Sequence, residues 1–107
     1  NGGYQTRDFI YIDDVVKIIE LSMKKVQLKK IADVFNVGTG RSIDINYLFK
    51  LIKKKLPNKC KIIRRPLDKF DPKKSSGKFN KLKIFLKKNK FSFTRLEEGI
   101  NKAISAL

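Results

Sequence analysis

Apolar residues recur at helical spacing in four segments of the chain. Hydrophobic side chains fall three or four residues apart over about 14–27, 43–56 and 79–88, and again in a last segment that opens at Thr94. This spacing places the apolar side chains of each segment on one face and most of its lysines on the other. The pattern therefore predicts four amphipathic helices.

Short β-prone runs lie between these segments, at 9–12, 34–37 and 61–64. The second run ends in Gly38-Thr39-Gly40, which we interpret as a tight turn that needs positive φ. The stretch 67–77 has no periodicity and is predicted to be an irregular loop. Because strands and helices alternate, we predict an α/β lobe with a short, largely parallel sheet. Its core should be thin, with one side exposed for a further domain.

The predicted helices have candidate capping residues at their starts. Asp13 and Ser42 stand at the starts of the first two helices, and Thr94 with Glu97 has the spacing of a capping box. Asp13 and Asp14 could also form a metal-binding or acid–base pair. Adjacent carboxylates at a helix start more commonly cap it and interact with its dipole, so we interpret both as structural.

Composition excludes several kinds of chemistry. The 107 residues include no His and one Cys, Cys60, which excludes His-based general bases, most zinc sites and an internal disulfide. Cys60 is interpreted as a small apolar residue of a strand. No apolar run reaches the roughly 20 residues of a membrane span, so a cytoplasmic protein with no membrane partner is expected. The start at Asn1, followed by two glycines, leads us to expect a segment of a longer protein.

Positive charge is concentrated in the middle of the chain. The net charge is +16, and residues 50–90 hold 17 Lys/Arg against 2 Asp/Glu. One interpretation is a stand-alone basic module that binds nucleic acid or another polyanion, since Phe70, Phe79 and Phe85 interleave with the basic residues. The other is a solvated, lysine-biased surface, with Phe79 and Phe85 packed in the core. We favour the second, because 21 of the 26 basic residues are Lys.

Two Arg–Asp combinations flank the predicted strands, where open α/β sheets bind ligands. Arg7 and Asp8 precede the first run, and Arg65 and Asp68 follow the third. Arginines converging from separate loops could bind a diphosphate, and a nearby carboxylate could accept hydrogen bonds from sugar hydroxyls. Alternatively, each Arg pairs with its neighbouring Asp. No arrangement supplies a nucleophile with a base, or a metal site, so the segment alone is not expected to be a catalyst.

The sequence resembles the extended short-chain dehydrogenase/reductase family in five ordered blocks. The first is Gly-Gly-Tyr-Gln-Thr-Arg-Asp-Phe-Ile-Tyr-Ile-Asp-Asp-Val-Val at 2–16, and the others lie at 35–43, 65–68, 81–86 and 96–100. This family includes the NAD-dependent nucleotide-sugar epimerases and dehydratases. The resemblance implies that the whole chain is a C-terminal nucleotide-sugar-binding domain. Its partner would be an N-terminal Rossmann domain that holds NAD, in an enzyme expected to be a homodimer.

The resemblance also implies roles for four residues. Arg7 and Arg65 would hold the pyrophosphate of a UDP- or dTDP-sugar, Asp68 the ribose hydroxyls, and Asn36 would line the same cleft. In this family, hydride transfer from the sugar to NAD⁺ begins an epimerisation, dehydration or reduction. The Gly-rich NAD fingerprint and the Tyr-x-x-x-Lys catalytic pair are absent from the chain. Catalytic residues and a bound cofactor are therefore not expected within it.

Overall fold

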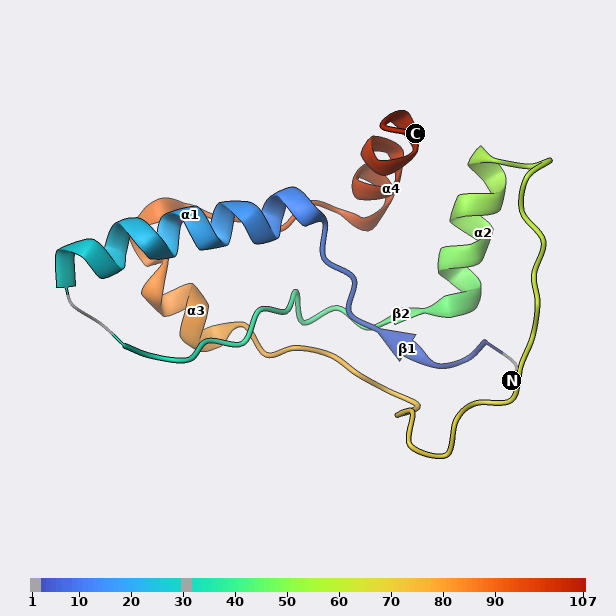
Figure 1. The fold of residues 1–107 in the computed structure, drawn as a ribbon, viewed down its shortest axis with the longest axis horizontal. Coiled ribbons are helices and arrows are strands. Elements are labelled where there is room, and N and C mark those ends of the chain that lie inside the picture. The colour runs from blue at the N-terminus through green and yellow to red at the C-terminus, as the bar shows by residue number, and fades with distance from the viewer. Residues whose placement is uncertain (1–2, 30–31) are drawn as a thin grey trace.

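The computed structural model describes residues 3–29 and 32–107 (Figure 1). The glycine-rich start of the sequence lies mostly outside the described residues, but Gly3 is included and has a left-handed φ of 73°. The described elements are, in order, β1 (Thr6–Arg7), α1 (Ile12–Lys29), β2 (Ile43–Asp44), α2 (Ile45–Lys55), α3 (Asn80–Phe85), the 3₁₀ turn η1 (Lys87–Asn89) and α4 (Leu96–Ser105).

Four α-helices form, as the apolar pattern predicts. α1 extends beyond its predicted range at both ends, and α2 begins later than predicted. The segment predicted as one helix over 79–88 is divided into α3 and η1. It ends where Lys90 takes a left-handed φ of 46°, a conformation that cannot continue a right-handed helix.

The core lies where the inner face of α1 meets the α3 region. Ile18 and Leu21 of α1 are 3% and 8% exposed, and Leu82 and Leu86 are 1% and 2% exposed. Five phenylalanines pack partly buried against this cluster: Phe35, Phe79, Phe85, Phe91 and Phe93. The rings of Phe79 and Phe93 pack edge to face, with their centroids 4.7 Å apart. The core-packing interpretation of Phe79 and Phe85 is therefore confirmed.

The sheet differs from the prediction. β1 and β2 form a two-stranded antiparallel pair, in which Thr6 lies opposite Asp44 and Arg7 opposite Ile43. The largely parallel sheet predicted from the alternation of elements is therefore wrong. Two strands as short as these present little apolar surface, so the sheet contributes less to the core than the helices do.

The three β-prone runs form no strand in the described chain. Ile12, in the run 9–12, already begins α1, and the runs 34–37 and 61–64 are irregular. Cys60 is half-buried and lies outside any strand, so its assignment to a strand was also wrong. A β-prone sequence forms a strand only when a neighbour supplies the paired N–H and C=O groups. No described segment pairs with these runs.

The residues predicted to cap the first two helices do not cap them. Asp44, not Ser42, caps α2: its Oδ1 accepts hydrogen bonds from the Asn46 and Tyr47 amides at 2.7 and 3.2 Å. Asp44 is also the last residue of β2, so the strand ends directly in the cap of the helix. Asp13 lies within the first turn of α1, which begins at Ile12, so its interpretation as the N-cap is wrong. Its negative charge still interacts favourably with the positive end of the helix dipole.

Asp14 links the starts of α1 and α4. It is 8% exposed, and it accepts hydrogen bonds from the Thr94 amide and hydroxyl, both at 2.8 Å. The predicted capping box is therefore wrong, because the carboxylate turns Thr94 toward α1 and α4 has no side-chain cap. Glu97 instead accepts the Tyr47 hydroxyl at 2.8 Å, which connects α4 to α2. The structural interpretation of Asp14 agrees with these contacts.

The elements form a flat, open layer rather than a sphere (Figure 1). The radius of gyration is 16.7 Å, against about 13 Å for a compact domain of this length, and the shortest extent is 17 Å. α1 is apolar on two faces, because its outer side exposes a stripe with 4-3-4-3 spacing: Ile12, Val16, Ile19, Met23 and Val26. The thin core expected from the sequence is confirmed in the described residues.

Candidate functional site

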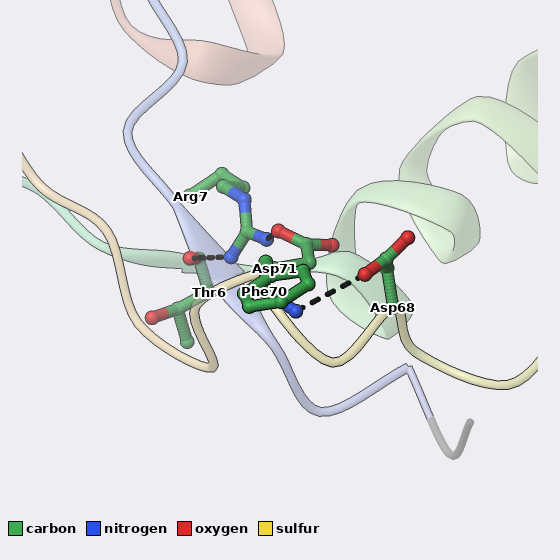
Figure 2. A network of polar contacts seen from close by, with 5 residues as sticks. All are labelled: Thr6, Arg7, Asp68, Phe70 and Asp71. Carbon is green, nitrogen blue, oxygen red and sulfur yellow. Dashed lines mark hydrogen bonds and ion pairs between the residues drawn. The ribbon is translucent and has the colours of Figure 1, made fainter.

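Arg7, at the end of β1, is fixed by two polar contacts. Its Nη2 forms an ion pair with Asp71 Oδ1, and its Nη1 donates to the Thr6 carbonyl at 2.8 Å (Figure 2). The Arg7 side chain is 25% exposed. Asp71 lies 64 residues further along the chain, so this contact joins β1 to the irregular loop that holds Arg65 and Asp68.

The loop is anchored to β1 by backbone hydrogen bonds as well. The Thr6 amide donates to the Lys73 carbonyl at 2.9 Å, and the Ser75 amide donates to the Thr6 carbonyl at 3.1 Å. The loop is irregular, as predicted for 67–77, with one isolated bridge between Thr6 and Lys74. β1 thus positions the segment that follows Arg65, although this segment forms no regular strand.

Arg65 and Asp68 line a first hollow of about 310 Å³ between the loop and the start of α2. Asp68 Oδ1 accepts the Phe70 amide at 3.1 Å, and the Asp68 carbonyl accepts the Asp71 amide, also at 3.1 Å. These bonds close a tight turn around Asp68. Arg65 forms no ion pair within the described chain, so its interpretation as a partner of Asp68 is wrong.

Arg7 and Asn36 line a second hollow of about 610 Å³, next to the loop at Ser75 and Gly77. The four predicted site residues are therefore divided between two hollows, and the structure does not bring them all into one pocket. The Arg7–Asp71 pair connects the two, because Asp71 lines the first hollow and Arg7 the second. The guanidinium of Arg7 thus lies at the boundary between them.

Asp8 has a structural role that sequence reasoning missed. Its carboxylate accepts the Thr39 hydroxyl, the Gly40 amide at 3.0 Å and the Gly77 amide at 3.1 Å. It does not pair with Arg7, whose partner is Asp71, so the alternative of neighbouring Arg–Asp pairs is wrong here too. Asp8 thus links the turn after residue 37 to the loop before α3 through hydrogen bonds.

Glycine is required where the turn and the loop cross. A Cβ atom on Gly38 would lie 2.4 Å from the Gly77 Cα, closer than any real Cβ contact. Gly40 has φ 74°, so the predicted turn with positive φ is confirmed. The glycines let Asp8 accept amides from both segments, and Asp8 and Gly77 line the second hollow.

Two buried acceptors near the first hollow have no hydrogen-bond partner within the described chain. They are Gln5 Oε1 and Thr6 Oγ1, and Gln5 lines the first hollow. A buried polar atom without a partner costs free energy, so these two oxygens oppose the local packing around β1. Neither residue was predicted, because a Gln next to a short strand or a Thr within it gives no sequence signal of its own.

A model of the NAD dependent epimerase/dehydratase family matches residues 1–38, which include β1, α1 and Asn36. The first third of the chain is thus similar to the NAD dependent epimerase/dehydratase family. The resemblance to this family is confirmed over the first sequence block, at 2–16, whereas the blocks at 65–68, 81–86 and 96–100 lie outside the matched residues. No solved structure matches the chain significantly.

Two curated proteins with similar sequences have names that are consistent with this family. A Methanocaldococcus jannaschii protein, named as a candidate UDP-glucose 4-epimerase, is 40% identical over 53 residues, or 48% of this chain and 15% of its own. The CDP-abequose synthase of Salmonella muenchen is 42% identical over 65 residues, or 54% of this chain and 20% of its own. The matched segment is thus at most a fifth of either relative, and both names refer to a nucleotide sugar.

The described residues do not fit the NAD site of an epimerase or dehydratase. A dinucleotide pyrophosphate binds free amides at a Gly-rich turn that opens a helix. The turn at 38–40 leads to β2 instead, and the Gly40 amide donates to Asp8. At the start of α2, the Asn46 and Tyr47 amides donate to Asp44. No tyrosine in the sequence has a Lys four residues later, so the catalytic pair of the family is not in this chain.

Neither a metal site nor a membrane span is found in the described part of the chain. Among the described residues, no group of three or more His, Cys, Asp or Glu side chains is placed to hold a metal ion. No helix in the described part is long and apolar enough to span a membrane. The polar hollows on either side of the Arg7–Asp71 pair remain the best candidate for ligand binding.

Proposed function

We propose that this chain is the nucleotide-sugar-binding part of an NAD-dependent sugar epimerase or dehydratase, and that it is not catalytic alone. The intact enzyme would supply NAD and the catalytic Tyr and Lys from a Rossmann domain outside this sequence. The observation that supports this most directly is the contact between Arg7 and Asp71. It joins the block at 2–16, within the family match, to the loop that contains Arg65 and Asp68.

In this proposal, Arg65 from the first hollow and Arg7 from the second bind the pyrophosphate of a UDP- or dTDP-sugar. A guanidinium forms two parallel hydrogen bonds to phosphate oxygens. Because Asp71 already pairs with Arg7, the pyrophosphate would displace this carboxylate or share the guanidinium with it. The anion would be further attracted by the excess of 15 positive charges in residues 50–90, 17 basic against 2 acidic.

The remaining contacts would orient the nucleoside and the sugar. Asp68 lines the first hollow and would accept hydrogen bonds from the ribose hydroxyls. Gln5 Oε1 is a further acceptor at the same hollow with no described partner. Asn36 lines the second hollow and would contact the sugar side of the pyrophosphate. The specific sugar would be selected mainly by the part of the enzyme outside this chain.

The test is a calorimetric or NMR titration of the chain with UDP-glucose, UDP and inorganic pyrophosphate at low salt. Arg7→Ala and Arg65→Ala should each weaken binding about 10- to 150-fold, the value of a charged hydrogen bond of about 1.5–3 kcal/mol. Arg41→Ala is the matched control, because Arg41 is exposed and lies outside both hollows. Equal losses in all three variants would contradict a site at Arg7 and Arg65.

Salt dependence separates this proposal from the alternative of a stand-alone polyanion-binding module. Polyanion binding through many lysines should fall steeply with salt and should not depend on the nucleoside. Tight, salt-sensitive binding of DNA, combined with no response to UDP-glucose, would overturn the proposed function. Retained UDP-glucose binding that depends on Arg7 would support it.

A further inference from the structure

Phe70 is the most exposed phenylalanine beside the candidate site. Its side chain is 90% exposed, whereas five other phenylalanines pack against the core. It lies in the turn closed by Asp68, and its amide donates to Asp68 Oδ1 at 3.1 Å. The next residue, Asp71, pairs with Arg7. Phe70 thus stands between Asp68 and Asp71 in the sequence of the turn, and Figure 2 shows all three residues together with Arg7.

We infer that Phe70 is the platform on which the nucleobase of the substrate stacks, an inference that rests on the proposed function. A nucleotide sugar places its base directly beyond the ribose. If Asp68 binds the ribose hydroxyls, an aromatic ring two residues away lies within reach of the base. Every base has a π-face, so stacking on Phe70 needs no hydrogen-bonding groups of its own. The contact would add affinity for a nucleoside over a bare pyrophosphate.

The turn geometry explains why Phe70 is placed for this role rather than for the core. Two bonds to Asp68, from the Phe70 and Asp71 amides, fix the backbone on both sides of the ring. A side chain whose backbone is already fixed loses less conformational freedom on binding than one in a mobile segment. The surrounding residues Lys69 and Lys73 are exposed and basic, which favours an anionic ligand near the ring.

Phe70→Ala tests the inference without disturbing the core, since the ring is exposed. Removing the platform should weaken UDP and CDP binding about 5- to 100-fold, as expected for one stacked base. Binding of inorganic pyrophosphate should change by less than about twofold, because it offers no base to stack. Equal losses for UDP and pyrophosphate, or no loss for UDP, would overturn the inference.

Phe70→Trp gives a direct optical readout, because the sequence has no tryptophan. UDP and CDP should quench the fluorescence of this single Trp, whereas pyrophosphate at the same occupancy should not. Unchanged fluorescence at saturating UDP would exclude stacking at this position. Ile84→Ala, at an exposed site on α3, is the control for loss of surface apolar area and should leave UDP binding unchanged.

Tyr4 provides the competing platform, since it is 79% exposed and follows Gly3, which lines the first hollow. A loss of UDP binding in Tyr4→Ala together with full binding in Phe70→Ala would assign the base to Tyr4 and overturn our inference. Failure of the proposed function gives a different result, in which neither UDP nor pyrophosphate responds to Arg7→Ala. The two failures are therefore distinguishable in one set of titrations.

Discussion

The α1–α3 core and the loop at 57–78 are held together by different forces. The core is apolar, with Ile18 and Leu82 at 3% and 1% exposure. The loop has no fully buried residue and is held by an ion pair to Arg7 and backbone bonds to Thr6. Apolar burial stabilises the first region, and a few directed polar contacts position the second. The region that carries the candidate site is therefore the less stable one.

This difference fits a site that must accept a ligand. A loop fixed by hydrogen bonds opens at lower free energy than a packed helix pair, and ligand loops are commonly drawn from such regions. The Arg7–Asp71 pair is exposed enough to be screened by salt, since Asp71 is 41% exposed. Four substitutions test this difference between the two regions.

The largest expected effect is in the core, at Leu82→Ala. Leu82 is 1% exposed, so truncation should remove apolar contacts and leave a cavity, at a cost of about 2–5 kcal/mol in the free energy of unfolding. Urea denaturation followed by circular dichroism measures this loss. Ile84→Ala, two residues further along α3 and 74% exposed, should cost less than about 0.5 kcal/mol. Similar losses in both variants would contradict the core assigned here.

Should Leu82→Ala fail to fold, Leu82→Val gives a graded version of the same test. This substitution removes less volume, so its free energy of unfolding should lie between those of the wild type and Leu82→Ala. A stability equal to that of the wild type would show that this side chain is not tightly packed.

The next effect is at the crossing of the turn and the loop, at Gly38→Ala. Its new Cβ would lie 2.4 Å from the Gly77 Cα, so one of the two backbones must shift. We expect a cost of about 1–3 kcal/mol, together with lost protection from hydrogen exchange at the Gly40 and Gly77 amides. Ser76→Ala, exposed and adjacent, should change neither quantity. Unchanged exchange in Gly38→Ala would contradict the crossing.

A smaller effect is expected for Asp8→Ala, which removes the acceptor shared by Thr39, Gly40 and Gly77. These donors are partly exposed and can bond to water, so the cost should be about 1–2 kcal/mol. Exchange at the Gly40 and Gly77 amides should accelerate, while amides in the middle of α1 stay protected. Asp13→Ala, at an exposed carboxylate outside this contact, is the control for loss of charge and should leave the Gly40 and Gly77 amides protected. Faster exchange throughout α1 would show that Asp8 supports the core as well.

The same contrast explains what the sequence could predict. The core side of the molecule is helical, and helices form their hydrogen bonds within one segment, so periodicity alone located α1, α2 and α4. The core packing of Phe79 and Phe85 was predicted for the same reason. A strand depends on a distant partner, and the parallel sheet was predicted wrongly because no described segment pairs with the runs at 34–37 and 61–64 as a strand.

Contacts between distant residues were the main part of the site that could not be predicted. Arg7 was singled out as a phosphate ligand, but nothing near it in sequence indicates Asp71 as its partner, 64 residues away. The capping box at Thr94 failed for a similar reason, because its hydroxyl bonds to Asp14, 80 residues distant. Local patterns identify which residues are chemically suited to a role. Only the fold decides which of several suitable partners they contact.

The smallest expected effect concerns the bond between the Tyr47 hydroxyl and Glu97, which links α2 to α4 at the surface. The hydrogen bond from Tyr47 lowers the pKa of Glu97 below its ordinary value, and the same bond raises the pKa of Tyr47. For Glu97, the stabilising contribution of this bond is complete at pH values above the pKa that Glu97 has in the unfolded chain. It is lost as the pH falls through the lower pKa that Glu97 has in the folded protein. For Tyr47, the stabilising contribution is complete at pH values below the pKa that Tyr47 has in the unfolded chain. It is lost as the pH rises through the higher pKa that Tyr47 has in the folded protein.

Tyr47→Phe should therefore lower the thermal unfolding midpoint at neutral pH by less than any change above. The difference from the wild type should vanish in acid, where Glu97 is protonated, and again in strong alkali, where Tyr47 ionises. Tyr4→Phe, at a tyrosine 79% exposed, should show no such window. A difference that stays constant from acid to alkali would mean that the ring, and not the hydroxyl bond, accounts for the contribution of Tyr47. In that case α2 and α4 would be joined by packing, as in the core, rather than by a directed polar contact, as at the loop.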